Sequence, residues 1–202
     1  LLQVTNYKKI DPKTKFDFSS VGRFLKKDKI IVISDFGVGL LNEELVKLIN
    51  TSKSKNYINV QTNSLNLGNN LFSKYKNCKY ISLDKREWEL ALKMEFDKKQ
   101  IYKIKKYYKY NTQKSITLGK NGSIFLEKNK EFYSPVFINK TIDTTGCGDA
   151  YFAITTLLTI VKADPKIIPF IGNIYAGIHS QYFGNSVIVD NVSFLKYIKS
   201  IL

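Results

Sequence analysis

The sequence predicts an α/β protein in which a mostly parallel sheet carries helices on both faces. Residues 29–34 are a short apolar run rich in β-branched residues, which is typical of a strand buried on both faces. Further predicted strands alternate with stretches that carry helix signals, and this alternation favours parallel pairing of the strands. The chain shows neither an internal repeat nor a flexible linker. We therefore expect one domain of this class.

The individual elements follow from local signals. The first strand is predicted at residues 29–34, and the segment with Gly37 and Gly39 ends it. Asn42 is expected to cap the next helix, because its side chain can accept a first-turn N–H and acidic residues follow it. The other strands are expected at residues 57–61, 79–83, 115–118, 123–127 and 131–134, with loops at 62–70 and 119–122. The helices are expected at residues 43–50, 87–94, 98–110, 150–161, 165–183 and 192–201, with a short helical stretch that ends near Tyr75.

Composition and cysteine usage exclude several classes of protein. The chain of 202 residues is long enough for a real core, and its 44% hydrophobic share argues against disorder. Cys78 and Cys147 are too few for a disulfide scaffold, and a single histidine, His179, argues against a zinc cluster. The best apolar run, residues 153–161, is half of the ~18 residues that a membrane span needs, and no signal-peptide pattern opens the sequence. We expect no membrane partner and a reducing, cytoplasmic location.

The formal charge of +15 leaves three partners open: a nucleic acid, an acidic membrane or a polyanionic small substrate. Residues 103–110 interleave lysines with tyrosines, a pattern that can stack nucleic-acid bases. The same stretch fits a helix with a solvated face and inward tyrosines. The abundance of Lys, Asn, Ile and Tyr is also typical of an AT-rich genome, which explains the charge without a partner. Specific nucleic-acid binding is therefore the less favoured interpretation.

The segment with the clearest chemistry is residues 143–149, Asp-Thr-Thr-Gly-Cys-Gly-Asp, which leads into an apolar helix. At the start of a helix, unpaired backbone N–H groups and the positive end of the dipole form an anion site. Gly146 and Gly148 flank Cys147 there, and small residues let the backbone approach a phosphate. Asp149 follows in the first turn, where a carboxylate can take the proton of an attacking hydroxyl. From spacing alone, a helix cap explains Asp149 equally well.

This segment, continued by Ala150, resembles the C-terminal signature of the ribokinase/PfkB carbohydrate kinases, with Cys147 in place of an alanine. Residues 116–122, Ile-Thr-Leu-Gly-Lys-Asn-Gly, are similar to the segment that lines the nucleotide in that family. Residues 84–87, Asp-Lys-Arg-Glu, stand where the family has Asn-x-x-Glu. Together the motifs cover almost the whole chain. The resemblance implies a ribokinase-like three-layer α/β/α sandwich.

The resemblance also implies a role for each matching residue. Asp149 would be the base that activates a sugar hydroxyl, and the N–H groups of Gly146, Cys147 and Gly148 would form the anion hole for the phosphoryl group. Glu87 would act on Mg²⁺ through water. The residues implied around ATP are Asp84, Thr117, Gly119, Gly122 and Asn173. The residues implied for a K⁺ ion are Asp143 and Thr145, and those near that loop are Gly184 and His179, the latter as a wall residue or a packed helix histidine.

The middle of the chain bears on the substrate. Residues 34–40 resemble a loop of the heptose-phosphate kinases of ADP-heptose synthesis, with Val38 in place of their characteristic lysine. Residues 59–70 resemble relatives in which a sugar kinase is fused to a nucleotidyltransferase. Asparagines in this stretch can bind sugar hydroxyls or phosphate, or close turns of their own. The substrate-side candidates are Asp35, Gly37, Asn63, Asn66 and Asn70.

Two departures from the family pattern affect the interpretation. Asp84 replaces the usual asparagine and adds a negative charge near bound phosphates, which either draws a cation closer or weakens ATP binding. The 202 residues contain no Gly-Gly-x-x-x-Asn type of motif, so we expect the family's N-terminal sugar-binding and lid part to be absent from them. We therefore expect residues 1–202 to be the C-terminal portion of a single ribokinase-like kinase domain.

The favoured interpretation is an ATP- and Mg²⁺-dependent kinase of a sugar or sugar phosphate, with a heptose-phosphate-like substrate preferred. A second interpretation is a catalytically impaired nucleotide- or sugar-binding domain that partners a nucleotidyltransferase. A third is a basic nucleic-acid-binding protein that uses residues 103–110. Besides the small-molecule substrate, the expected partners are a second copy in a homodimer and a fused or separate nucleotidyltransferase domain.

Overall fold

Six strands form one sheet in the part of the chain that the computed structural model describes, residues 19–25, 29–62, 66–97, 101–107, 111–138, 140–184 and 186–201. The strands are β1 (Ile30–Asp35), β2 (Lys55–Val60), β3 (Cys78–Asp84), β4 (Gln113–Thr117), β5 (Ser123–Glu127) and β6 (Lys130–Ser134). They lie in the sheet in chain order. β1 to β4 pair in parallel, whereas β4–β5 and β5–β6 are antiparallel. The predicted mostly parallel sheet is confirmed.

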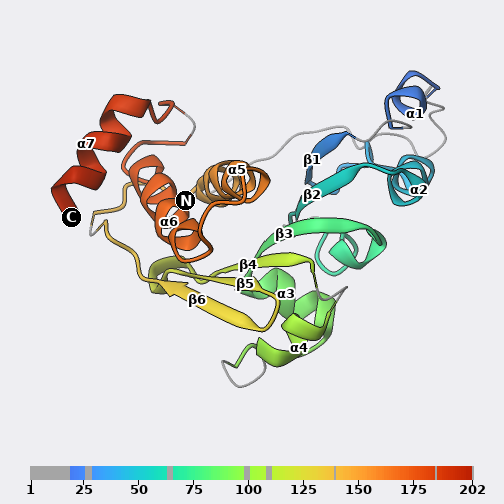
Figure 1. The fold of residues 1–202 in the computed structure, drawn as a ribbon, viewed down its shortest axis with the longest axis horizontal. Helices are drawn as coiled ribbons and strands as arrows, with labels where there is room; N and C mark the ends of the chain where they lie inside the picture. The colour runs from blue at the N-terminus through green and yellow to red at the C-terminus, as the bar shows by residue number, and fades with distance from the viewer. Residues whose placement is uncertain are drawn as a thin grey trace.

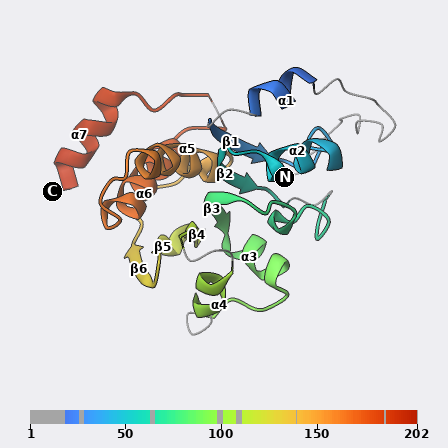
Figure 2. The same cartoon turned by 45° about the vertical axis from the view of Figure 1, so that its right-hand side comes forward.

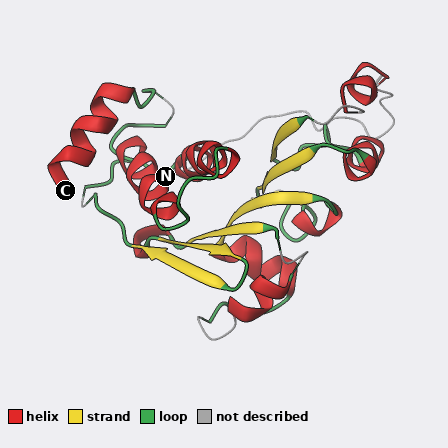
Figure 3. Cartoon of the chain, viewed as in Figure 1, coloured by secondary structure: helices red, strands yellow, loops and turns green. Residues whose placement is uncertain are grey.

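Helices lie on both faces of this sheet (Figures 1 and 3). They are α1 (Ser19–Leu25), α2 (Glu43–Thr51), α3 (Lys85–Leu92), α4 (Ile101–Lys106), α5 (Cys147–Ile160), α6 (Ile167–His179) and α7 (Asn191–Ile201), with 3₁₀ turns η1 (Phe72–Lys74) and η3 (Gly119–Asn121). α5 and α6 cover one face, and α7 lies outside α6. On the other face lie α2, α3 and α4, with α1 next to α2 (Figure 2). This is the three-layer α/β/α arrangement.

Alternation of side chains along the buried strands builds two cores. Ile58 of β2 and Ile81 of β3 pack with residues of α2, α3 and α4. Tyr57 and Tyr80, one residue earlier on the same strands, pack with Phe152 of α5. Because helices cover both faces, apolar residues are required on both sides of β2 and β3. This explains why adjacent residues of each strand, Tyr57 with Ile58 and Tyr80 with Ile81, are both buried. The apolar run at residues 29–34, predicted to be buried on both faces, forms the edge strand β1, where Ile30 and Val32 are exposed.

Most predicted elements agree with the structure to within a few residues. Asn42 caps α2 as predicted, since its Oδ1 accepts the N–H of Leu45 at 3.0 Å. The helix predicted at residues 165–183 is shorter and ends at His179. α1 was not predicted from the sequence. None of the helices in the described ranges has the length and apolar character that a membrane crossing requires.

The basic segment around α4 packs as a helix with an apolar inner side. Ile104 is fully buried, and Tyr107 packs edge-on against a core phenylalanine ring. Lys105 forms an ion pair with Glu131 of β6 at 2.6 Å, whereas Tyr102 is exposed. Residues 108–110, part of the proposed base-stacking segment, lie outside the described residues. The described part fits the solvated-face interpretation, because a lysine and a tyrosine are already used within the fold.

Lys114 of β4 is a buried lysine, and it predicts an unusual dependence of stability on pH. Its side chain is 2% exposed, and its Nζ donates to the carbonyls of Thr112 at 2.9 Å and Lys105 at 3.5 Å. Burial lowers the pKa of Lys114 to about 8 from its ordinary value of 10.5. Between these two values the unfolded chain binds more protons than the folded one, so the free energy of unfolding rises with pH.

We expect this rise to be at most about 3 kcal/mol and to be absent in Lys114→Met. The difference between wild type and Lys114→Met in chemical denaturation from pH 8 to 10 measures it, because the tyrosines and thiols of the unfolded chain titrate alike in both proteins. The matched control is Lys130→Met, which removes an exposed lysine of β6 and is expected to retain the rise. An equal pH dependence in wild type and Lys114→Met would contradict the assignment.

Candidate active site

The carboxyl ends of the parallel strands meet at one edge of the sheet, and the predicted motifs lie there. Asp84 and Thr117 are register partners at the ends of β3 and β4. Gln61 follows the end of β2. Asp149, in the first turn of α5, accepts a hydrogen bond from Gln61 Nε2 to its Oδ1 at 2.6 Å. Ligand sites of open α/β sheets characteristically lie outside this edge.

These strand ends and the start of α5 surround a polar cavity of about 230 Å³. The structure brings together six residues that the sequence predicted: Asp84, Glu87, Thr117, Gly146, Gly148 and Asp149. Five further residues of the lining were not predicted: Asn59, Gln61, Thr62, Ser82 and Leu83. All five lie on or next to the carboxyl ends of β2 and β3, and four of them are polar, so a search for polar residues at strand ends would have found those four.

The glycine-rich turn presents the start of α5 to this cavity. Gly146 is the N-cap residue and has φ of 79°, a left-handed conformation that glycine adopts without strain. The N–H of Cys147 donates to the carbonyl of Thr144 at 3.2 Å. The N–H groups of Gly148 and Asp149 belong to the first turn, where N–H groups have no acceptor within the helix. The turn can therefore donate to an anion in the cavity.

The carboxyl group of Asp149 has an environment suited to accepting a proton. Burial raises its pKa, while the hydrogen bond from Gln61 and the charge of nearby His179 act in the opposite direction. A carboxylate with a raised pKa is a stronger base than an exposed one. Cys147 next to it is not an activated nucleophile, because burial and then the charge of Asp143 raise the pKa of its thiol.

Hydrogen bonds hold the loop before α5 against the end of α6. Asp143 Oδ1 accepts the N–H of Thr145, and its Oδ2 accepts the N–H of Gly184, both at 2.9 Å. These backbone hydrogen bonds lower the pKa of Asp143. His179 Nε2 lies 3.1 Å from the carbonyl oxygen of Thr145, and its side chain is buried. The four residues thus lie together as expected, and a K⁺ ion at Asp143 and Thr145 stays a prediction.

Asp84 and Glu87 form a capping box at the start of α3. Asp84 Oδ1 accepts the N–H of Glu87 at 2.7 Å, and Glu87 Oε2 accepts the N–H of Asp84 at 2.8 Å. Glu87 Oε1 also accepts the N–H of Thr62 at 2.9 Å, which joins α3 to the end of β2. Burial, followed by the charge of Asp84, raises the pKa of Glu87 to about 7, although its backbone hydrogen bonds oppose this. A cation bound here would offset the crowding of negative charge.

Three residues implied around ATP do not line the cavity. Gly119 and Gly122 lie in the turn between β4 and β5, and Gly122 has φ of 82°. A side chain at Gly122 would overlap the carbonyl oxygen of Ser134, so glycine is required there for close packing. Asn173 of α6 is buried and donates to the carbonyls of Ser134 at 2.8 Å and Pro135 at 3.0 Å. These contacts join α6 to the end of β6, and contact with a nucleotide stays a prediction.

The substrate-side candidates form a separate cluster at the end of β1. Asp35 is 3% exposed, and its carboxylate accepts from Tyr75 Oη at 2.8 Å and from the N–H of Gly37 at 3.0 Å. Its Oδ2 also forms an ion pair with Lys74 at 2.6 Å. This network holds the loop that follows β1. Asn63 lies outside the described residues.

Asn66 and Asn70 close the turns of their own loop. The Nδ2 of Asn66 donates to the carbonyls of Phe36 at 3.0 Å and Gln61 at 3.2 Å. The Nδ2 of Asn70 donates to the carbonyls of Asp35 at 3.0 Å and Gln61 at 3.2 Å. Both side chains are buried. In this structure they follow the turn-closing alternative, and sugar binding by them stays a prediction.

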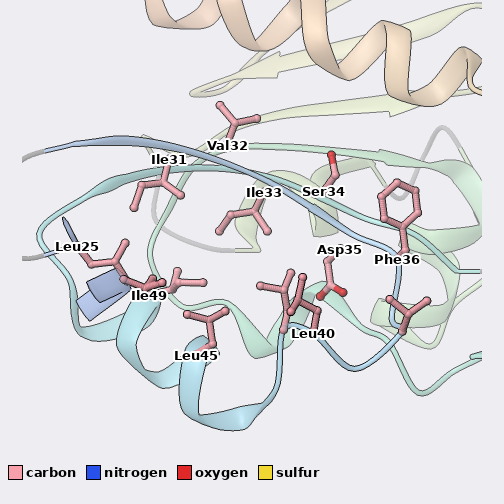
Figure 4. A pocket seen from close by; sticks show the side chains of 13 residues that line it. Leu25, Ile31, Val32, Ile33, Ser34, Asp35, Phe36, Leu40, Leu45 and Ile49 are labelled. Atoms are coloured by element: carbon pink, nitrogen blue, oxygen red, sulfur yellow. The ribbon is translucent and has the colours of Figure 1, made fainter. Parts of the chain in front are cut away.

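A second cavity lies beneath β1 and differs in chemistry from the first. Its volume is about 310 Å³, and it lies between β1, α1 and α2. Apolar side chains such as Leu25, Ile33, Leu45 and Ile49 line it, and Asp35 is its charged residue (Figure 4). It offers no arrangement for phosphate chemistry.

Comparison with known proteins agrees with this geometry. The model of the pfkB family of carbohydrate kinases matches residues 4–182. The chain is 27% identical over 132 residues to the bifunctional protein HldE of Helicobacter pylori strain J99, and 31% identical over 128 residues to that of Helicobacter hepaticus. These alignments include 63% and 61% of this chain but 28% and 26% of the relatives, so the chain spans less than a third of their length.

Solved structures show the same fold. Phosphofructokinase-2 from Escherichia coli superposes with a TM-score of 0.71 at 14% identity, covering 91% of this chain and 62% of its own. Arabidopsis thaliana ribokinase, solved with ribose and ATP, gives a TM-score of 0.68 at 15% identity, covering 89% and 59%. The family match extends over most of the chain and includes the turn and carboxylates of the polar cavity. The chain belongs to the pfkB family of carbohydrate kinases.

Proposed function

We propose that the protein transfers the γ-phosphoryl group of ATP to a hydroxyl of a sugar or sugar phosphate. The observation that carries this proposal is the polar cavity, where the first turn of α5 and Asp149 face Asp84 and Glu87 across about 230 Å³. An anion-binding turn, a half-buried carboxylate base and two further carboxylates are groups that suit phosphoryl transfer. Family membership supports the same reaction class.

The chain's own residues then have distinct tasks. Asp149 takes the proton of the acceptor hydroxyl as the hydroxyl oxygen forms its bond to the γ-phosphorus. The bond from the γ-phosphorus to the bridging oxygen breaks, and ADP leaves with that electron pair. The resemblance implied an anion hole of the Gly146, Cys147 and Gly148 N–H groups, but the N–H of Cys147 donates to Thr144 within the turn. In this proposal the N–H groups of Gly148 and Asp149 donate to the phosphoryl oxygens, on which negative charge is spread. Catalysis is mainly positioning and charge stabilisation.

The donor set at the cavity fits Mg²⁺. Glu87 and Asp84 are carboxylates, the hard oxygen ligands that this ion prefers. Both oxygens of Glu87 already accept backbone N–H groups, which suits contact through water. Among the described residues no group of three or more His, Cys, Asp or Glu side chains is arranged to hold a metal. This fits an ion held by one or two carboxylates and the phosphates of ATP, whose charge it would neutralise.

A heptose-phosphate-like acceptor is the preferred substrate within this proposal. Residues 34–40 resemble the corresponding loop of heptose-phosphate kinases, and bifunctional HldE proteins are among the relatives. The same relatives support a fused or separate nucleotidyltransferase as partner. In the cell, the product would then be used by an enzyme that activates a sugar phosphate with a nucleotide.

A binding domain without catalysis is the second candidate, and one observation favours it. The carboxylate of Glu87 is engaged by two backbone N–H groups, and Asp84 beside it adds a charge that repels phosphates. The two functions are separated by incubating the full-length protein with ATP, Mg²⁺ and, in turn, ribose, fructose 6-phosphate and heptose phosphates. A kinase forms ADP in an amount equal to the new phosphate ester. Binding of ATP without ADP formation on any acceptor would favour the second candidate.

A further inference from the structure

Gln61 joins two layers of the fold at the proposed reaction centre. It follows β2, and its Nε2 donates to Asp149 Oδ1 at 2.6 Å, although 88 residues separate the two in sequence. The side chain is half-buried and lines the polar cavity. A neutral amide that donates to a carboxylate forms a charge-assisted hydrogen bond, which is stronger and more directional than a neutral one.

The backbone of Gln61 is held independently of any ligand. Its N–H donates to the carbonyl of Asp35 at 2.8 Å. Its carbonyl accepts from the amides of Asn66 and Asn70, each at 3.2 Å. The next residue, Thr62, donates its N–H to Glu87 Oε1 at 2.9 Å. The buried asparagines therefore fix the position from which the Gln61 side chain reaches Asp149.

The neutrality of the Gln61 amide also suits this position. The titratable groups near Asp149 are Glu87 of α3, whose charge interacts with it, and His179 of α6. A lysine or arginine in place of Gln61 would compete with Mg²⁺ for the phosphates, whereas a carboxylate would repel Asp149. An amide orients one carboxylate oxygen and leaves the other to face an acceptor hydroxyl, without adding charge to the cavity.

We propose that Gln61 is the positioning residue of Asp149, and that Asn66 and Asn70 act on the reaction by holding Gln61 in place. This inference rests on the proposed phosphoryl transfer. The loop of residues 66–70 would then influence turnover through the hydrogen bonds of its asparagines, without touching the substrate. Outer hydrogen-bond partners of metal ligands contribute about 10- to 100-fold to activity, and we expect an effect of the same order for the partner of a carboxylate base.

The test compares Gln61→Met and Gln61→Glu with Gln113→Met. Gln113 is the matched control, because its Nε2 also donates to a carboxylate, Glu127 Oε1 at 2.7 Å, at the opposite end of β4. With ATP and whichever acceptor the wild type phosphorylates, we expect kcat to fall about 10- to 100-fold in Gln61→Met, and further in Gln61→Glu, where two carboxylates meet. KM for ATP should change less than twofold, and Gln113→Met should retain the kcat of the wild type.

A spectroscopic measurement checks the contact without reference to turnover. The side-chain amide protons of Gln61 should shift in the NMR spectrum of Asp149→Ala, whereas those of Gln113 should not. Unchanged Gln61 amide signals, or a wild-type kcat in Gln61→Met, would overturn the positioning role and leave the proposed kinase activity standing. A wild-type protein that phosphorylates no acceptor would overturn both. A loss of kcat together with the amide shift supports the inference.

Discussion

In Asp149→Asn we expect kcat for sugar phosphorylation to fall about 10³-fold, with the Kd for ATP changed less than twofold. The amide is nearly isosteric and can still accept the hydrogen bond from Gln61, so the local structure is retained. It cannot take the proton of the acceptor hydroxyl, and general-base catalysis contributes roughly 10²- to 10⁴-fold. Steady-state kinetics and calorimetric titration of ATP measure the two quantities.

The control is Asp164→Asn, which makes the same change in the exposed turn before α6, where Asp164 accepts the N–H of Lys166. This variant should have wild-type kinetics. If Asp149→Asn retained more than a tenth of the wild-type kcat, the carboxylate would not be the base. The helix-cap alternative does not fit the structure, because Gly146 is the N-cap residue of α5 and the Asp149 carboxylate accepts its hydrogen bond from Gln61.

At Gly148 we expect a small side chain to raise the stability of the fold and a large side chain to lower activity. A Cβ at Gly148 would meet no atom within 4 Å, and the residue lies in the first turn of α5 while lining the polar cavity. Gly148→Ala should therefore stabilise the fold by about 0.5–1 kcal/mol, because glycine is the poorer helix former. Gly148→Leu should fill the space proposed for the phosphoryl group and lower kcat/KM at least about 10²-fold without unfolding the protein.

Denaturation curves and kinetics on the same preparations separate these effects. Gly22 offers a matched control, because it lies in α1 and a Cβ there also meets no atom within 4 Å. Gly22→Leu should leave kcat/KM unchanged. Normal activity in Gly148→Leu would show that phosphate does not bind against the first turn of α5.

The part of the fold that the sequence predicts best is the set of buried parallel strands. In these strands adjacent apolar residues, such as Tyr57 with Ile58 and Tyr80 with Ile81, pack against helices on opposite faces. The ends of helices are less predictable, because the aromatic residues Tyr182 and Phe183 fit a continued helix although α6 ends at His179. α1 was missed because its seven residues carry no acidic first turn or clear cap signal.

The site shows the same division between local and long-range information. Asp149 and the glycines around it are contiguous, so a motif could identify them. Gln61 lies 88 residues from Asp149, and only the pairing of β2 with its neighbours and the packing of α5 bring the two together. Asn66 and Asn70 have side chains compatible with binding sugar, and only their buried contacts with carbonyl groups reveal the structural use. The sequence shows which polar side chains are present, and only the tertiary contacts show which of them remain free for a ligand.

The most direct test of the proposed function follows the labelled phosphoryl group itself. The full-length protein is incubated with ATP labelled at the γ-phosphorus, Mg²⁺ and a heptose phosphate, with Asp149→Asn in parallel, and the products are separated. Phosphoryl transfer predicts label in a new phosphate ester of the sugar at a 1:1 ratio to ADP, and about 10³-fold less of it with Asp149→Asn. Label that remains in ATP, or that appears only as inorganic phosphate with every sugar and sugar phosphate tested, would contradict the proposal.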